Sequence, residues 1–424
     1  MKCINCGTDN NLKDRTANSG KCSNCNHAFV FEPTSMGTIK ITDPLFAKVI
    51  SDISVNNTLF FTPKQMFYLL DKRFRRKGFN PTSFVFVFIL VHVFLFAIFP
   101  IILIYQLFHI INLYRITNSP KLDNASRKAS AKSLSFVGIF VLAISMFNLL
   151  LSIGGGELYF FLIFVVEVLF GMTAIYLSIT QLNKTRLPQE LLIPESDVQD
   201  WLNRWQQING NILKLLPKPQ HQNQSATINP DVTAYSFDRL IVCDRADIAQ
   251  FLIANNFHFE NNCAILSITG YPQSIFQTTM DMLRRNPDLK VYALHDCTPK
   301  GLGLTHHLRT SPTWFQNSNV AIIDIGISPR QVLATKKGIF IESSPQSATD
   351  AKQLIPEIRQ DLSPEEIQWL SAGNIVNLES FQPQKLLEII QRGIVNTRTL
   401  GSDNNDLIII GGASTFIYAT ESFG

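Results

Sequence analysis

The sequence predicts a multi-domain protein with a small cysteine-rich module, an α-helical transmembrane region and a C-terminal α/β domain whose sheet is mostly parallel. Two CxxC pairs lie within the first 25 residues, long uncharged runs lie between residues 83 and 182, and β-type runs alternate with helix-length segments after residue 237. The expected boundaries are 1–35 for the cysteine-rich module, 36–82 for a helical basic juxtamembrane segment, 83–182 for the transmembrane region, 183–233 for a helix and linker, and 234–424 for the α/β domain.

Composition and charge separate these regions. Of the 424 residues, 46% are hydrophobic and 17% are charged, whereas soluble proteins have about 25% charged residues. This composition excludes a disordered chain, a collagen-like chain and a small disulfide scaffold. The net charge is +6 over residues 1–82, +2 over 83–182 and −4 over 183–424. A nucleic-acid partner needs a basic surface, so the acidic C-terminal domain argues against one unless it carries a local basic patch.

The N-terminal cysteines have the spacing of a tetrahedral metal site. Cys3 and Cys6 form one CxxC pair, and Cys22 and Cys25 form a second pair after fifteen intervening residues. Two such pairs can direct four thiolates at one structural Zn²⁺, while two disulfides are the alternative. The module is too short for a self-sufficient core, so bound zinc would supply its folding free energy. The pattern resembles a zinc ribbon over about residues 1–33.

Three apolar stretches have the length of membrane-spanning helices. Residues 83–114 and 133–153 contain no Lys, Arg, Asp or Glu, and residues 157–182 contain only Glu157 and Glu167. A spanning helix needs about 20 predominantly apolar residues, so each stretch is long enough. We therefore expect a multi-pass integral membrane protein, with the lipid bilayer as a partner.

Basic residues beside these stretches predict their orientation. They precede the first stretch (Lys64, Lys72, Arg73, Arg75, Arg76 and Lys77) and fill the next loop (Arg115, Lys121, Arg127, Lys128 and Lys132). Basic flanks favour the cytoplasmic side of the membrane. Both flanks of residues 83–114 can lie on that side if this stretch crosses twice or forms a hairpin bent near Pro100. One long tilted helix is the alternative. We expect both soluble ends in the cytoplasm. Thiolate ligands and unpaired cysteines (Cys243, Cys263 and Cys297) favour a reducing compartment, which agrees with this location.

Two features bear on the use of the membrane region. Thr62-Pro63 begins a predicted helix that runs to Phe74 and carries apolar and basic side chains. It is either an interfacial helix on anionic headgroups or an ordinary linker. Glu167 lies near the middle of the last apolar stretch, where an ionisable side chain is a functional hypothesis by default. A second helix is expected from Ser196, as its N-cap, to about Leu216.

The C-terminal pattern predicts a parallel, doubly wound sheet. Strand-like runs are RLIVCD, CAILSIT, KVYALHD and VAIIDIG, and helices are expected at Ala246–Asn255 and Ile275–Arg285. In such sheets the chemistry gathers at the carboxyl ends of the strands. The acidic residues there are Asp244, Asp296 and Asp324. Residues 361–400 read as helical and peripheral, and Leu407–Ile410 before Gly411-Gly412 reads as a further strand.

The order VCDRADIAQFL, SITGYP, VYALHDCTPKGLGL and IDIGISPRQV resembles the Toprim domain of topoisomerase VI A-subunit relatives, over residues 237–335. The resemblance implies a magnesium site for phosphoryl transfer, built from carboxylates after the first and third strands. Asp244 stands where the family has Glu, Asp296 is kept, and Thr298 replaces the second Asp. Pro299 and Gly301 are kept. The upstream module that would supply a nucleophilic Tyr is not found.

Three functional hypotheses follow. The first is a membrane-anchored, non-enzymatic protein whose zinc ribbon or degenerate Toprim-like domain binds a protein partner, with weak affinity for Mg²⁺ because a carboxylate is missing. The second is an Mg²⁺- or Mn²⁺-dependent phosphotransfer or nuclease-like enzyme that uses Asp244 and Asp296, with Asp324 as a further ligand. The third and weakest is a transporter built around Glu167. Cys297, His295, His306 and His307 are expected to be structural.

Overall fold

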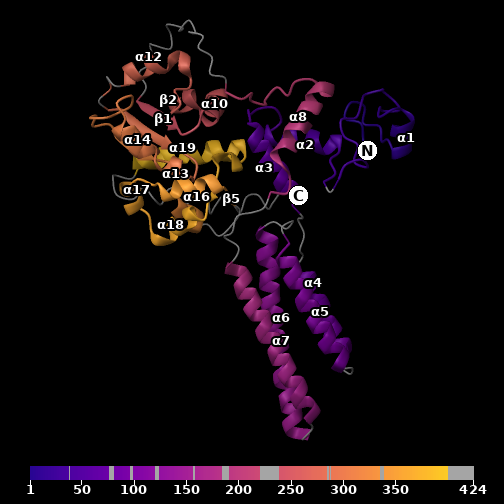
Figure 1. Ribbon diagram of the computed structural model, residues 1–424. Helices are drawn as coiled ribbons and strands as arrows, with labels where there is room; N and C mark the ends of the chain where they lie inside the picture. The colour runs from indigo at the N-terminus through magenta and orange to yellow at the C-terminus, as the bar shows by residue number, and fades with distance from the viewer. Residues whose placement is uncertain are drawn as a thin grey trace. The chain divides into compact units, whose positions relative to one another are not determined.

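The computed structural model describes residues 1–37, 39–75, 81–95, 99–119, 124–155, 158–183, 191–219, 238–283, 286, 288–334 and 339–399. The strand predicted at Leu407–Ile410 lies outside these residues. The chain forms two compact units, one made of Met1–Asp71 with Ile193–Gly424 and the other of Lys72–Leu192. The protein is therefore multi-domain, and its first unit is assembled from both ends of the sequence (Figure 1).

The cysteine module (residues 1–37) packs on two helices. It contains α1 (Leu12–Ala17), which a capping box between Asn11 and Asp14 begins. The supporting helices are α2 (Asp43–Ile53) and α8 (Glu195–Asn209). Phe31 of the module packs with Phe46 of α2 and Trp205 of α8, and the Phe46 ring centroid lies 5.0 Å from each of the other two. The module thus has a small aromatic core in addition to its cysteines.

Two predicted helix features differ in the structure. The helix expected from Ser196 to Leu216 is α8, which follows Pro194 without a side-chain cap and ends at Asn209. It stops there because Gly210 has a positive φ of 81°, which lies outside the helical region and which glycine adopts without strain. Most apolar side chains of α3 (Pro63–Phe74) are buried in protein, namely those from Met66 to Leu70. An interfacial helix that lays Met66, Phe67 and Leu70 into headgroups is therefore wrong.

The segment before α3 joins the C-terminal domain directly. Phe61 forms a parallel β-bridge with Leu215, and Phe61 N–H donates to the Lys214 carbonyl at 2.9 Å. The Asn255 side chain accepts from Phe60 N–H at 2.8 Å and donates to the Phe60 carbonyl at 3.1 Å. Residues before and after the Lys72–Leu192 segment therefore share one hydrogen-bonded core.

The predicted parallel sheet is confirmed. Its strands are β1 (Arg239–Cys243), β2 (Cys263–Ser267), β3 (Lys290–Leu294) and β4 (Ala321–Asp324), all parallel in the order β2-β1-β3-β4. Helices accompany the strands, namely α10 (Ala246–Ala254), α11 (Phe257–Asn261), α12 (Gln273–Leu283), α13 (Pro299–Leu302), α14 (Leu304–Thr310) and α15 (Pro329–Ala334). Alternate strand residues fill two apolar clusters, one with Ile241 and Tyr292 and the other with Val242 and Val291. Both faces of the sheet are therefore covered, as its continuous apolar runs require.

The segment after β4 completes the core and is not peripheral as expected. It contains β5 (Glu342–Ser343), α16 (Pro345–Lys352), α17 (Pro356–Gln360), α18 (Pro364–Ser371), β6 (Asn374–Ile375), the 3₁₀ helix η2 (Leu378–Ser380) and α19 (Pro383–Thr399). β5 and β6 pair in antiparallel fashion. Trp369, Val376, Leu386 and Ile390 are buried in the same cluster as Ile241. Their burial also brings η2 to the edge of the sheet.

The described residues of the second unit form four apolar helices, α4 (Pro81–Leu95), α5 (Phe99–Thr117), α6 (Asn124–Gly155) and α7 (Leu158–Asn183). Two of them, over Ser126–Gly155 and Leu158–Leu182, are long and apolar enough to cross a membrane. Within the 83–114 stretch α4 packs against α5, with the ring centroids of Phe84 and His109 4.5 Å apart, so the single long helix considered for it is wrong. Figure 1 shows α4 beside α5 and α6 beside α7. A Cβ at Gly171 would lie 2.6 Å from Leu142 Cγ, so α6 and α7 approach closely at this glycine.

Candidate metal centre and sheet-edge site

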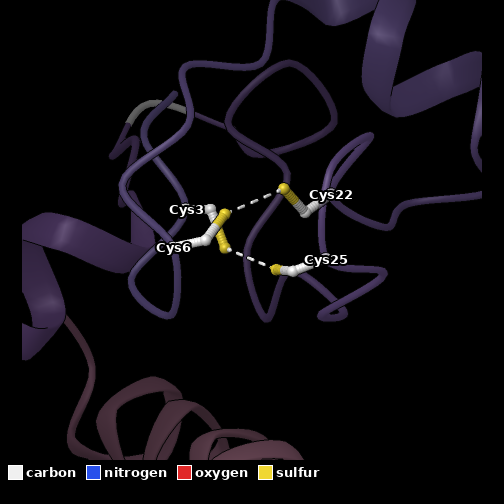
Figure 2. A group of neighbouring side chains, drawn as sticks. All are labelled: Cys3, Cys6, Cys22 and Cys25. Carbon is white, nitrogen blue, oxygen red and sulfur yellow. Dashed lines mark hydrogen bonds between the residues drawn. The ribbon is translucent and has the colours of Figure 1, made fainter.

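The four N-terminal cysteines converge as their spacing predicts. Their sulfur atoms all lie within 4.8 Å of one another, and Figure 2 shows them pointing toward a common centre. Cys3 Sγ lies 3.7 Å from Cys25 Sγ, and Cys6 Sγ lies 3.6 Å from Cys22 Sγ. A tetrahedral zinc ion with Zn–S bonds of about 2.3 Å separates its sulfurs by about 3.8 Å. All four cysteines are free thiols, so two disulfides are not formed. The cluster can hold one metal ion such as zinc.

Both CxxC pairs use the same backbone turn. Cys3 N–H donates to the Thr8 carbonyl and Gly7 N–H to the Cys3 carbonyl, each at 2.9 Å. The second pair repeats these bonds from Cys22 to the His27 carbonyl and from Asn26 to the Cys22 carbonyl, at 2.9 and 3.0 Å. Gly7 and Asn26 have positive φ angles of 73° and 56°, which glycine and asparagine tolerate best. The sequence therefore encodes two equivalent halves of one site.

Asn10 connects the two halves. It is fully buried, and its Nδ2 contacts Cys22 Sγ at 3.4 Å while its Oδ1 accepts from Ser23 N–H at 2.9 Å. Hydrogen bonds also set the acidity of the thiols. Those from Thr8 lower the pKa of Cys6 to about 6, and backbone N–H groups of Cys25 and Asn24 lower the pKa of Cys22. Burial raises the pKa of Cys3 to about 11. A bound cation would favour the thiolate at all four positions.

At the carboxyl edge of the sheet an arginine contacts the predicted carboxylates. Asp296 follows β3, and its Oδ2 lies 2.9 Å from Arg245 Nε. Arg245 Nη2 donates to Glu379 of η2 at 2.8 Å, and Thr62 Oγ1 donates to the other oxygen of Glu379 at 2.5 Å. The side chains of Asp296 and Glu379 are 4% and 2% exposed. One guanidinium thus joins two buried carboxylates.

One oxygen of each of the two predicted aspartates accepts a backbone hydrogen bond, while Asp244 Oδ1 is buried without a partner among the described residues. Leu378 N–H donates to Asp296 Oδ1 at 2.6 Å, and Asp296 N–H donates to Asp244 Oδ2 at 2.9 Å. Burial, and then the charge of Asp296, raise the pKa of Asp244 to about 6. Burial would lower the pKa of Arg245, but the charges of Asp296 and Glu379 outweigh it and raise that pKa. Arg245 therefore stays protonated and supplies the positive charge of this edge.

Asp324, the third predicted carboxylate, lies in a different pair. Its Oδ1 lies 3.0 Å from His295 Nε2 and accepts from Gly326 N–H at 2.8 Å. Burial would lower the pKa of His295, but the charge and hydrogen bond of Asp324 raise it to about 9. A Cβ at Gly326 would lie 2.4 Å from the imidazole, so a glycine is needed there. Across the described residues, the four cysteines are the one group of three or more His, Cys, Asp or Glu whose ligand atoms converge.

The other residues of the third-strand segment have structural positions. Thr298 Oγ1 accepts from Gly301 N–H at 2.9 Å and caps α13. A Cβ at Gly301 would lie 2.3 Å from the Asp296 carbonyl oxygen. Cys297 is fully buried, exchanges backbone hydrogen bonds with Val376, and has a pKa raised by burial. His306 and His307 lie on α14, where His306 is half-buried and His307 is exposed.

Comparison with known proteins gives no further guide. The sequence matches no protein-family model, and no curated protein matches it. The assignment of the site therefore rests on its geometry.

The sequence analysis did not predict the arginine and the amide side chains that contact the predicted carboxylates. Arg245 lies in the quoted VCDRADIAQFL segment directly after Asp244, and this adjacency was the available signal. Glu379 and Thr62 lie far away in sequence and carried no signal. In the second unit Glu167 accepts hydrogen bonds from Gln106 and Asn148, two residues that the sequence analysis did not single out.

Proposed function

We propose that the chain is a membrane-anchored, non-enzymatic protein that binds a protein partner in the cytoplasm. A zinc ribbon and a degenerate Toprim-like domain would act together as its binding unit. The observation that carries the proposal is the double contact of Arg245 with Asp296 and Glu379. A protonated guanidinium between these carboxylates supplies the charge that a divalent cation would otherwise bring, and it repels such an ion.

The segments before residue 72 and after residue 192 pack against each other, which supports placing both on the same side of the membrane. Phe61 bridges to Leu215, and Thr62 donates to Glu379, 317 positions later in the chain. Segments that share a hydrogen-bonded core cannot be separated by a bilayer. The region between residues 72 and 192 would therefore cross an even number of times. Basic residues of the 115–132 loop favour the cytoplasm for the same side.

Helix lengths favour a shallow insertion for the first hairpin. At 1.5 Å per residue, α4 is about 22 Å long and α5 about 28 Å, against a hydrocarbon core of about 30 Å. By the same measure α6 is about 48 Å and α7 about 39 Å long. We therefore assign two full crossings to α6 and α7, and a shorter hairpin to α4 and α5.

Manganese binding by the full chain tests this function against the phosphotransfer alternative. The full chain is needed because Phe60, Phe61 and Thr62 belong to the core that a C-terminal fragment would lose. We expect Asp296→Asn to leave Mn²⁺ binding unchanged. Tight Mn²⁺ binding that Asp296→Asn abolishes would instead support the metal-dependent enzyme.

A further inference from the structure

One end of the α5–α6 pair carries a concentrated positive charge. Residues 112–133 contain one acidic residue and five basic residues, and their net charge is therefore +4. The basic residues are Arg115, Lys121, Arg127, Lys128 and Lys132. The uncharged run of α5 ends directly before Arg115, and that of α6 begins directly after Lys132. Cations therefore flank the apolar parts of both helices at this end, which is called the cationic end below.

Hydrogen bonds hold the two helices together at the cationic end. Thr117 Oγ1 of α5 lies 3.0 Å from Ser130 Oγ of α6, and Arg127 Nε donates to the Thr117 carbonyl at 3.2 Å. Arg115 precedes Thr117 by two residues, and Lys132 follows Ser130 by two residues. Because α6 returns along α5, both steps lead away from the loop, each by about 3 Å. Arg115 and Lys132 therefore lie at about the same depth along the helix pair.

Each of these two cations continues into a stripe of exposed apolar side chains. The residues four and seven positions away, toward the middle of the helix, share a helix face with the cation. They are Ile111 and Phe108 on α5, at 41% and 65% exposure, and Phe136 and Ile139 on α6, at 46% and 58%. Arg115 and Lys132 are exposed as well, and neither forms an ion pair within the part of the chain that the structure describes. Both helices thus present a cation followed by apolar surface.

We propose that the cationic end binds the headgroup of an anionic phospholipid. Arg115 and Lys132 contact the headgroup charge, and the acyl chains lie along the two apolar stripes. Basic side chains beside a membrane-spanning helix attract anionic headgroups because the cytoplasmic leaflet has a negative surface potential. The inference rests on the membrane anchoring that the proposed function includes, and it adds a lipid ligand to the protein partner.

The exposed stripes decide between a lipid and a water-soluble anion. Positive charge alone also suits a nucleic acid or a free phosphate. Such ligands would leave the apolar side chains of both stripes exposed to water, whereas acyl chains cover them. Phosphatidylcholine covers them too, but its choline cation cancels the charge of its phosphate. Charge complementarity to a net charge of +4 therefore favours an anionic phospholipid.

Lipid selectivity of the full chain tests the proposal. Zinc-loaded protein in phosphatidylcholine vesicles would receive spin-labelled phosphatidylglycerol or spin-labelled phosphatidylcholine. The motionally restricted part of the electron spin resonance spectrum then measures how strongly each lipid associates with the protein. We expect about fivefold stronger association for phosphatidylglycerol. Arg115→Gln with Lys132→Gln should make the two lipids nearly equal, whereas Arg115→Lys with Lys132→Arg should keep the preference.

A charge-matched control separates the site from the overall charge of the protein. Lys13→Gln with Arg309→Gln removes two exposed cations from the other unit, so the preference for phosphatidylglycerol should remain. The proposal is overturned if the unchanged chain shows no preference, or if Arg115→Gln with Lys132→Gln retains it. Displacement of the labelled phosphatidylglycerol by glycerol 3-phosphate or an oligonucleotide, at constant ionic strength, would assign the cationic end to a water-soluble anion.

The same spectra distinguish failure of this site from failure of the proposed function. A restricted component that is equal for the two lipids would overturn the anionic site and leave the membrane anchor in place. A spectrum without a restricted component for either lipid would contradict the membrane anchor itself, and with it the proposal made here.

Discussion

Arg245 Nε lies 2.9 Å from Asp296 Oδ2 at the carboxyl edge of the sheet. The same guanidinium reaches Glu379, so one side chain neutralises two buried carboxylates. In the resemblance to Toprim domains this edge would hold magnesium. We propose that an internal cation takes that place in this chain, and that the domain serves for binding.

Arg245 should be a strong determinant of stability. Arg245→Gln leaves Asp296 and Glu379 buried without a cation, and breaking a buried ion pair costs about 3 kcal/mol. Chemical denaturation of the purified chain should show this loss in the free energy of unfolding. Arg204→Gln is the control, because Arg204 is exposed on α8. A change in Arg245→Gln no larger than in the control would mean that the ion pairs do not stabilise the fold.

Zinc should be required for the cysteine module to fold. Cys22→Ser removes one of four thiolate ligands, so bound zinc and the ordered structure of residues 1–33 should be lost together. Zinc content by elemental analysis and protease cleavage within residues 1–33 measure both effects. Cys263→Ala changes a buried cysteine of β2 and should keep one zinc per chain. Retention of zinc by Cys22→Ser would contradict the four-thiolate site.

The His295–Asp324 pair should make stability depend on pH. The folded-state pKa of His295 is raised to about 9, while an unperturbed histidine titrates near 6.5. The folded protein thus holds this proton more tightly than the unfolded chain. The stabilisation is complete below pH ~6.5 and declines as the pH rises toward about 9. The difference in unfolding free energy between the unchanged chain and His295→Gln should shrink over that interval, and a constant difference would refute the pairing.

Single-cysteine labelling should place the basic loop on the side of the soluble domains. With membrane-impermeant reagents on spheroplasts or sealed vesicles, Ser119→Cys and Asn203→Cys should react from the same side, and Gly154→Cys from the opposite side. The reason is that the α4–α5 hairpin and the pair of crossings by α6 and α7 each return the chain to the side that both soluble segments share. Labelling of Ser119→Cys and Gly154→Cys from one side would contradict the crossing assigned to α6.

Gly171 should be essential for the contact between α6 and α7. A leucine there places its Cβ 2.6 Å from Leu142 Cγ, so the helices must separate. We expect Gly171→Leu to lower the thermal stability of the detergent-solubilised protein. Gly154→Leu is the matched control, because a Cβ at Gly154 meets no atom within 4 Å. Equal stability of the two variants would show that α6 and α7 do not depend on this close approach.

Local sequence patterns predicted the strands and the cysteine cluster of this chain better than they predicted its tertiary contacts. The CxxC pairs and the β-type runs carry their geometry within a few residues, so the thiolate cluster and the four parallel strands could be predicted. The contacts of Arg245 could not, because Glu379 reaches it only through the fold of η2 and because residues after 361 read as surface helices. Gln106 and Asn148 stood as polar residues in apolar helices, but their convergence on Glu167 required the packing of all four helices.

Location of manganese in crystals of the full chain tests the central claim most directly. Anomalous scattering from crystals soaked in Mn²⁺ would report each ion by position. The account predicts no ion beside Asp296 in the unchanged protein, and an ion there in Arg245→Gln, where the internal cation has been removed. A fully occupied ion beside Asp296 with Arg245 in place would contradict it.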